Sequence, residues 1–206
     1  SDKKTILVTS NSPGEGKTFT TINIGAILAK SGKKVVMLEL DLHKPRIQKA
    51  LEMNADAGIS TFMVGANTLG EIVKPTVVNN LYAILSGPIP PNPSDLVLNE
   101  KLKELINYAK ANFDFVLIDT PPVGMLADAA YLMQYADINL MVVNTKFANR
   151  QILSLFHKLV EDNAIQNMYL VLNGVKRKRN RYYYSRYGYG YGYGYGYGYG
   201  YGYGNK

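Results

Sequence analysis

The sequence lacks cysteine, so the chain forms no disulfide and offers no thiol for catalysis or metal binding. It has no apolar run of about 18 residues, the length that a membrane-spanning helix needs, and no signal-peptide pattern at its start. These absences are compatible with a cytoplasmic location. The chain opens with Ser1 rather than Met, and a strand is expected from Thr5, so we expect a piece of a longer protein.

Acidic residues are missing from the last part of the chain. Residues 176–206 contain seven of the 23 Lys and Arg residues and no Asp or Glu, whereas the 16 basic and 16 acidic residues of 1–175 cancel. The net charge of +7 therefore belongs to the tail. Such a run is one way to bind nucleic acid or anionic lipid, but the neutral body leads us to expect no nucleic-acid partner.

The same tail contains twelve of the 17 tyrosines, most of them alternating with glycine. Glycine loses the most conformational freedom on ordering, and a Tyr-Gly strand would have one bare face. We therefore predict two parts, a folded domain over 1–175 and a basic, flexible tyrosine cluster over 176–206. An adhesive low-complexity segment is the alternative interpretation of the cluster.

Short, continuous apolar runs alternate with amphipathic stretches along 1–175, which predicts an α/β fold. The expected strands are Thr5–Ser10, Lys34–Leu40, Leu81–Leu85, Phe113–Thr120, Ile138–Asn144 and Met168–Val175. The expected helices are Thr18–Lys30, Pro93–Ala111, Asp128–Tyr135 and Asn149–Asp162. Right-handed crossovers then give a doubly wound, mostly parallel sheet flanked by helices, of the P-loop NTPase type, with ligands at the carboxyl ends of the strands.

A phosphate-binding loop follows the first expected strand, in the stretch SNSPGEGKTFTTIN at 10–23. The loop amides and the start of the next helix would hold phosphate oxygens, Lys17 would neutralise their charge, and the Thr18 hydroxyl would bind Mg²⁺. Asn11 replaces the usual first glycine of the motif, but Gly14 and Gly16 keep the loop glycine-rich. The alternative is an ordinary glycine turn before a helix.

Three carboxylates end two of the expected strands. Asp119 closes FDFVLID, while Glu39 and Asp41 close KVVMLELD, with side chains on one side because strands have a period of two. A carboxylate among apolar neighbours is costly unless it pairs with a charge or a metal. Together with the loop, these acids predict a nucleotide–Mg²⁺ site, although any one of them alone fits a solvated strand end.

In these motifs the chain resembles the bacterial tyrosine kinases (BY-kinases) of capsule and exopolysaccharide export. The matching pieces are TSNSPGEGKT at 9–18, VVMLELDLHKP at 35–45, SGPIPPNPSDL at 86–96, FDFVLIDTPPV at 113–123 and the terminal tyrosine cluster. The resemblance implies an ATP-dependent autokinase whose subunits phosphorylate each other's clusters within a ring. It also implies a membrane polysaccharide co-polymerase domain, fused or separate, a tyrosine phosphatase as a further partner, and a place at the cytoplasmic face of the membrane in a larger membrane protein.

The resemblance and the site chemistry together assign roles to individual residues, with ATP and Mg²⁺ as cofactors. Lys17, Glu39 and Asp41 are the catalytic candidates, with Glu39 expected to orient or deprotonate the incoming phenol. Thr18, Asp41 and Asp119 are expected to hold Mg²⁺. The expected ATP-binding residues are Pro13, Gly14, Glu15, Gly16, Lys17, Thr18, Phe19 and Asn173, the last of which is otherwise a strand-end cap. The expected phosphoacceptors are Tyr182, Tyr183, Tyr184, Tyr187, Tyr189, Tyr191, Tyr193, Tyr195, Tyr197, Tyr199, Tyr201 and Tyr203.

The chain departs from the family pattern in its second acidic motif. The family typically has DxDxR there, whereas this chain has Glu39, Asp41 and His43. The third position therefore lacks the permanently charged guanidinium group of arginine, which can bind an anion through two N–H groups at once. The arginine-bearing helix that the family carries upstream has no counterpart here. The stretch 86–96 is either a subunit-contact loop or a rigid turn.

Two other functions fit the same loop and acids. One is a ParA/MinD-like ATPase switch, although such proteins usually have an extra lysine early in the loop, where this chain has Ser10, Asn11 and Ser12. The other is a scaffold that binds ATP without catalysis.

Overall fold

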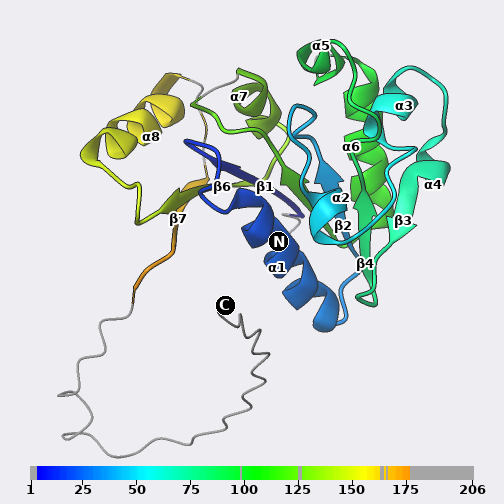
Figure 1. Ribbon diagram of the computed structural model, residues 1–206, viewed down its shortest axis with the longest axis horizontal. Coiled ribbons are helices and arrows are strands. Elements are labelled where there is room, and N and C mark those ends of the chain that lie inside the picture. Colours follow the sequence, from blue (N-terminus) through cyan, green and yellow to red (C-terminus); the bar gives the residue numbers. More distant parts are fainter. Residues whose placement is uncertain (1–3, 98, 125–126, 163–164, 166, 177–206) are drawn as a thin grey trace, which may run out of the picture. The chain divides into compact units, whose positions relative to one another are not determined.

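A computed structural model describes residues 4–97, 99–124, 127–162, 165 and 167–176 (Figure 1). The chain divides into two units, Ser1–Val175 and Lys176–Lys206. The predicted phosphoacceptor tyrosines all lie outside the described residues, so the role of the second unit stays a prediction. No helix in the described ranges is long and apolar enough to cross a membrane.

The first unit is built around one mixed sheet. Its strands are β1 (Thr5–Ser10), β2 (Val35–Glu39), β3 (Val73–Pro75), β4 (Leu81–Ile84), β5 (Phe115–Asp119), β6 (Ile138–Asn144) and β7 (Met168–Asn173). Within the described residues they pair in the order β3-β4-β2-β5-β1-β6-β7, and every pair is parallel except β3 with β4. The expectation of a mostly parallel sheet is confirmed.

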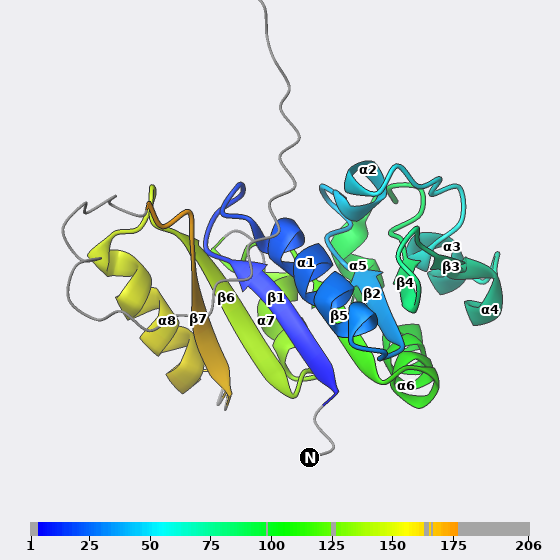
Figure 2. The same cartoon turned by 90° about the horizontal axis from the view of Figure 1, so that it is seen from below.

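Helices cover both faces of this sheet. They are α1 (Lys17–Lys30), α2 (Ile47–Ala50), α3 (Ile59–Met63), α4 (Leu69–Ile72), α5 (Pro93–Val97), α6 (Lys101–Asn112), α7 (Ala127–Met133) and α8 (Arg150–Asp162). Helix α1 lies on one face, and α6 and α7 lie on the other (Figure 2). The crossovers thus give the doubly wound arrangement that the alternating pattern predicts.

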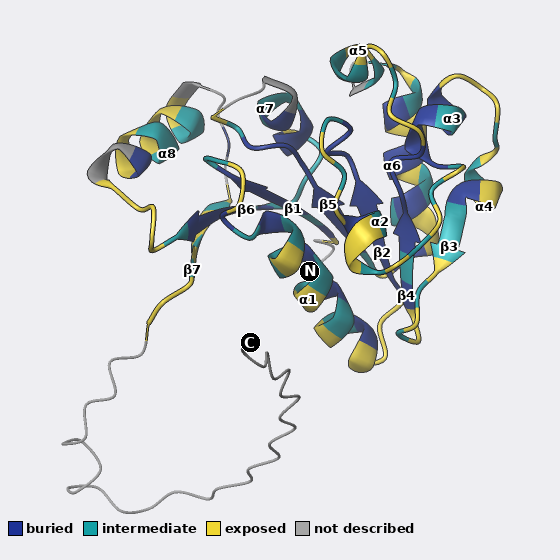
Figure 3. Cartoon of the chain, in the orientation of Figure 1, coloured by how far each residue is buried: buried dark blue, intermediate teal, exposed yellow. Residues whose placement is uncertain are grey.

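The core separates into clusters on the two sides of the sheet. Leu7, Val36 and Ile118 face the larger cluster, which includes residues of α6 and α7. Met37 and Leu117 face the side of α1. Strands β1, β2 and β5 are therefore buried on both faces, as Figure 3 shows, which explains why they have continuous apolar runs.

Two expectations about elements were wrong. The single helix expected over Pro93–Ala111 is two helices, α5 and α6, and ahead of α6 the Asn99 Oδ1 accepts a hydrogen bond from the Lys101 N–H at 2.9 Å. The antiparallel strand β3 was not expected, and it lies at the sheet edge, where Pro75 is tolerated. The short helices α2, α3 and α4 were not expected either, and the remaining strands and helices agree within a few residues.

Candidate nucleotide-binding site

The site begins where β1 ends and α1 starts. Between them the loop turns at Gly14 and Gly16, which have φ angles of 83° and 101°, in the left-handed region that favours glycine. A Cβ at Gly16 would overlap the side-chain amide of Asn173. The loop therefore lies so close to the end of β7 that only glycine fits at position 16. Gly16 is therefore required by both conformation and space.

Two side chains stabilise the loop through hydrogen bonds, Glu15 from within it and Asn173 from the end of β7. Glu15 is buried, and its Oε2 accepts a hydrogen bond from the Ser12 N–H at 2.7 Å. Asn173 donates through Nδ2 to the Glu15 carbonyl at 2.9 Å. Both residues were expected to bind ATP. In this structure they shape the loop, and neither lines the cavity beside it.

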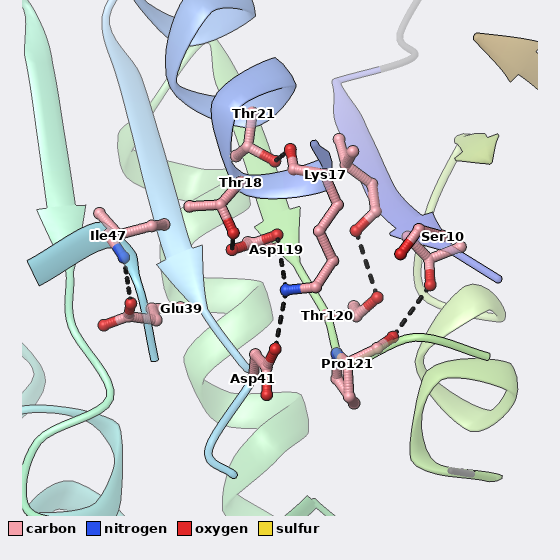
Figure 4. A network of polar contacts seen from close by, with 12 residues as sticks. Ser10, Lys17, Thr18, Thr21, Glu39, Asp41, Ile47, Asp119, Thr120 and Pro121 are labelled. Carbon is pink, nitrogen blue, oxygen red and sulfur yellow. Dashed lines mark hydrogen bonds and ion pairs between the residues drawn. The ribbon is translucent and has the colours of Figure 1, made fainter. Parts of the chain in front are cut away.

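Lys17 lies between two of the predicted carboxylates (Figure 4). Its ammonium is 2.7 Å from Asp41 Oδ2 and 3.6 Å from Asp119 Oδ1, and all three side chains are nearly inaccessible to solvent. The Thr18 hydroxyl donates to Asp119 Oδ2 at 2.7 Å. The sheet register explains the convergence, because β1 and β2 both pair with β5 and place Val8 and Glu39 opposite Asp119.

The surroundings of Asp119 shift the pKa of its carboxyl group. Burial raises its pKa to about 6, an effect that the nearby Lys17 ammonium partly opposes. Its Oδ1 is buried and accepts no hydrogen bond from the residues that the structure describes. An orphaned carboxylate oxygen beside a threonine hydroxyl suits a hard divalent cation such as Mg²⁺.

The fit to Mg²⁺ depends on oxygens from outside the protein. Among the described residues, no group of three His, Cys, Asp or Glu side chains forms a ready-made metal cage. Mg²⁺ typically takes one or two carboxylates and completes its shell with phosphate and water oxygens. Thr18, Asp41 and Asp119 therefore fit a metal that arrives with a nucleotide.

A cavity of about 410 Å³ opens directly beside this group. Six residues of the loop and of the start of α1 line it, namely Pro13, Gly14, Gly16, Lys17, Thr18 and Phe19. Its other walls are Asp41, His43, Lys44, Arg46, Pro121 and Pro122. The cations Lys44 and Arg46 were not predicted from the sequence. Their place in the segment that follows β2, close to Asp41, could have indicated that they lie near the site.

Glu39 does not reach this cavity. Its carboxylate is completely buried and accepts a hydrogen bond from the backbone N–H of Ile47 (Figure 4). It accepts a second one from the backbone N–H of Ser86. It thereby ties the end of β2 to the start of α2 and to the residues after β4. This arrangement favours a positioning role for Glu39 over the predicted contact with a phenol.

His43 also connects the segment after β2 to a neighbour. It lines the cavity, and its Nε2 lies 3.5 Å from the hydroxyl of Ser94 in α5. The histidine that replaces the expected arginine thus contacts the proline-rich stretch 86–96.

Comparisons with known proteins agree with this geometry. Residues 3–171 match the family model described as AAA domain. The chain is 35% identical over 177 residues to the tyrosine-protein kinase wzc of Salmonella typhimurium, a match that covers 84% of this chain and 24% of the relative. It is 35% identical over 142 residues to the tyrosine-protein kinase YwqD of Bacillus subtilis, covering 69% of this chain and 60% of the relative.

Among solved structures, the kinase domain of the Escherichia coli tyrosine kinase ETK superposes with a TM-score of 0.81 at 26% identity, covering 95% of this chain and 73% of that one. The chain spans less than two thirds of the two curated relatives described above. It belongs to the AAA domain family, in the bacterial tyrosine-kinase branch that its motifs resemble.

Proposed function

We propose that this chain is the ATP-dependent catalytic domain of a protein-tyrosine kinase, and that it phosphorylates the tyrosine cluster of neighbouring copies. The observation that carries the proposal is the position of Lys17. Its ammonium lies between Asp41 and Asp119 at the start of α1, beside a cavity lined by the glycine loop. That arrangement suits the binding and transfer of a terminal phosphate.

The proposed transfer is direct. The phenolic oxygen of a tyrosine attacks the terminal phosphorus of ATP, a new O–P bond forms, and the bond to the ADP oxygen breaks with its electron pair. Mg²⁺, when bound, neutralises part of the phosphate charge. Lys17 and the loop amides stabilise the charge that develops on the transferred group.

Among the carboxylates that the structure describes, Asp41 is the one that lines the cavity. It is therefore our candidate to accept the phenolic proton. Glu39 supports it indirectly, because its bonds to the Ile47 and Ser86 amides hold the segment that carries Asp41. Thr18 and Asp119 complete the metal-binding oxygens.

The biological setting belongs to the same proposal. We expect a ring-like homo-oligomer, a membrane polysaccharide co-polymerase domain as fused or separate partner, and a phosphatase that removes the phosphates. The relatives are named tyrosine-protein kinases, and we extend that activity to this chain together with a role in polysaccharide export at the inner face of the membrane.

Intact mass after incubation with ATP and Mg²⁺ tests the proposal. We expect a ladder of added phosphates on the chain, which disappears in Lys17→Met because the phosphate loses its cation. Lys33→Met is the matched control, since Lys33 is exposed in the turn after α1 and is not one of the cavity residues. Its ladder should equal that of the unmodified chain.

Other outcomes would replace the proposal. ATP hydrolysis without a mass gain, measured with the co-polymerase partner present, would favour an ATPase switch of the ParA/MinD type. ATP binding with neither turnover nor mass gain would favour a non-catalytic scaffold.

A further inference from the structure

A second hollow adjoins the nucleotide cavity. It lies between the first turns of α1 and helix α2, has a volume of about 490 Å³, and includes Ile22 and Lys49. It shares Thr18, Phe19 and Arg46 with the nucleotide cavity. A ligand in one hollow is therefore adjacent to a ligand in the other.

The lining of this second hollow combines cations with an aromatic surface. Arg46 and Lys49 are exposed, and neither has an ion-pair partner among the residues that the structure describes. No carboxylate of the described part of the chain lines the hollow. The Phe19 side chain is 66% exposed beside them, so its ring is accessible to a ligand.

These features match an aryl phosphate. Arginine and lysine bind phosphate oxygens through charge-assisted hydrogen bonds, and an exposed ring offers a surface for a second ring. A neutral phenol would leave both cations without a partner. The hollow therefore favours a phosphorylated tyrosine over an unmodified one.

We propose that this hollow binds a phosphotyrosine of the acceptor segment while a neighbouring tyrosine of that segment occupies the transfer site. The inference rests on the proposed kinase function. In the tail, tyrosines recur every second residue from Tyr187 to Tyr203. Two residues of extended chain advance roughly 7 Å, a spacing that carries one ring into each of two adjoining hollows.

Charge gives this site a consequence for the order of events. The unmodified tail carries seven basic residues and no acid, so Arg46 and Lys49 repel it. A phosphate adds roughly −1.5 to −2 charges, and where it lies beside these two cations it replaces the local repulsion with attraction. One phosphorylation thus promotes the next, and the cluster is modified progressively rather than at random.

Peptide binding tests the site without requiring catalysis. A labelled peptide with the sequence of residues 185–192 is compared with the same peptide phosphorylated at the position of Tyr189, by fluorescence anisotropy with the full chain and saturating Mg–ADP. We expect the phosphopeptide to bind about tenfold more tightly. Lys49→Ala should abolish most of that preference, while Lys33→Ala, an exposed lysine outside the hollow, should keep it.

Competitors identify the chemistry that is recognised. Phenyl phosphate should displace the phosphopeptide at lower concentration than inorganic phosphate, because the hollow contacts the ring as well. A preference that vanishes when Mg–ADP fills the loop would place the phosphate at the nucleotide site and overturn the proposal. Equal affinity of both peptides, or a preference unaffected by Lys49→Ala, would overturn it as well.

The two proposals fail in different ways. If no peptide is phosphorylated but Lys49 still governs phosphopeptide binding, the kinase function falls and the phosphotyrosine site stands. If peptides are phosphorylated with the same KM whether or not a phosphotyrosine is already present, the kinase function stands and the site falls.

Discussion

At the scale of single residues, the buried carboxylates divide into two kinds. Glu39 is fully satisfied by two backbone amides, and such a group acts by holding the chain. Asp119 has an oxygen without a hydrogen-bond partner, and such a group awaits a ligand. Two carboxylates at paired strand positions therefore perform different tasks.

Glu39→Gln tests the holding role. The glutamine amide would turn one N–H group toward the backbone N–H of Ile47 or Ser86, which leaves a buried donor without an acceptor. We expect the free energy of unfolding to fall by about 1–3 kcal/mol in urea titrations. Glu104→Gln, at an exposed site on α6, should change it by less than about 0.5 kcal/mol. Equal effects of the two changes would contradict the positioning role.

Asp119 predicts a pH dependence of stability. Its pKa is raised in the folded chain, from an ordinary value of 3.8 to about 6, so the folded state binds a proton more tightly than the unfolded state between these values. This group therefore adds stability as the pH falls through about 6 toward 4 and removes it as the pH rises. Asp119→Asn lacks this proton, so we expect the unmodified chain to gain stability relative to the variant on acidification.

Thermal unfolding of both nucleotide-free proteins across this pH window measures the effect. Glu104→Gln serves again as the control and should track the unmodified chain. A difference between the unmodified chain and Asp119→Asn that stays constant with pH would contradict the raised pKa.

At the scale of elements, Gly16 at the start of α1 packs closely against the Asn173 side chain at the end of β7. Gly16→Ala introduces a methyl group where the Asn173 amide lies and forces alanine into a left-handed φ of 101°. Gly14→Ala has a similar backbone cost at φ 83° but meets no atom within 4 Å. We expect Gly16→Ala to lose more stability and more nucleotide affinity than Gly14→Ala.

A double-mutant cycle isolates the contact. Asn173→Ala removes the side chain that the new methyl group would meet, so the double variant Gly16→Ala/Asn173→Ala should recover part of the loss. We expect a coupling energy of about 1–2 kcal/mol from urea unfolding. Strict additivity would show that backbone strain alone explains the effect of Gly16→Ala.

At the scale of the whole molecule, charge separates the two parts of the chain. All of the +7 net charge belongs to residues 176–206. At roughly −1.5 to −2 charges per phosphate, about four phosphates cancel it and further ones make the tail anionic. We expect phosphorylation to weaken the association of subunits of the full-length protein and to change its salt dependence.

Light scattering of phosphorylated and dephosphorylated full-length protein at several salt concentrations measures this outcome. We expect smaller assemblies after phosphorylation. The same size distribution in both forms at every salt concentration would contradict a charge-controlled cycle of assembly.

Much of the fold followed from local patterns. Continuous apolar runs marked the strands that are buried on both faces, and the glycine loop with Lys17 and Thr18 marked the start of α1. The short elements α2, α3, α4 and β3 carry too few residues to produce a period, and Asn99 divides a stretch whose helical pattern looks continuous.

The sequence by itself determined the mostly parallel sheet and the glycine loop with Lys17 and Thr18 that lines the cavity, because strand burial and loop chemistry are local properties. Tertiary structure decided which of the acids stabilises the backbone and which one faces the cavity. The register of β2 against β5 and the packing of α2 direct the Glu39 carboxylate to backbone amides, while Asp41 faces the cavity. It also brought Arg46, Lys49 and Phe19 around one hollow. Phe19 lies 27 and 30 positions before Arg46 and Lys49 in the chain, and only the folded backbone makes it their neighbour.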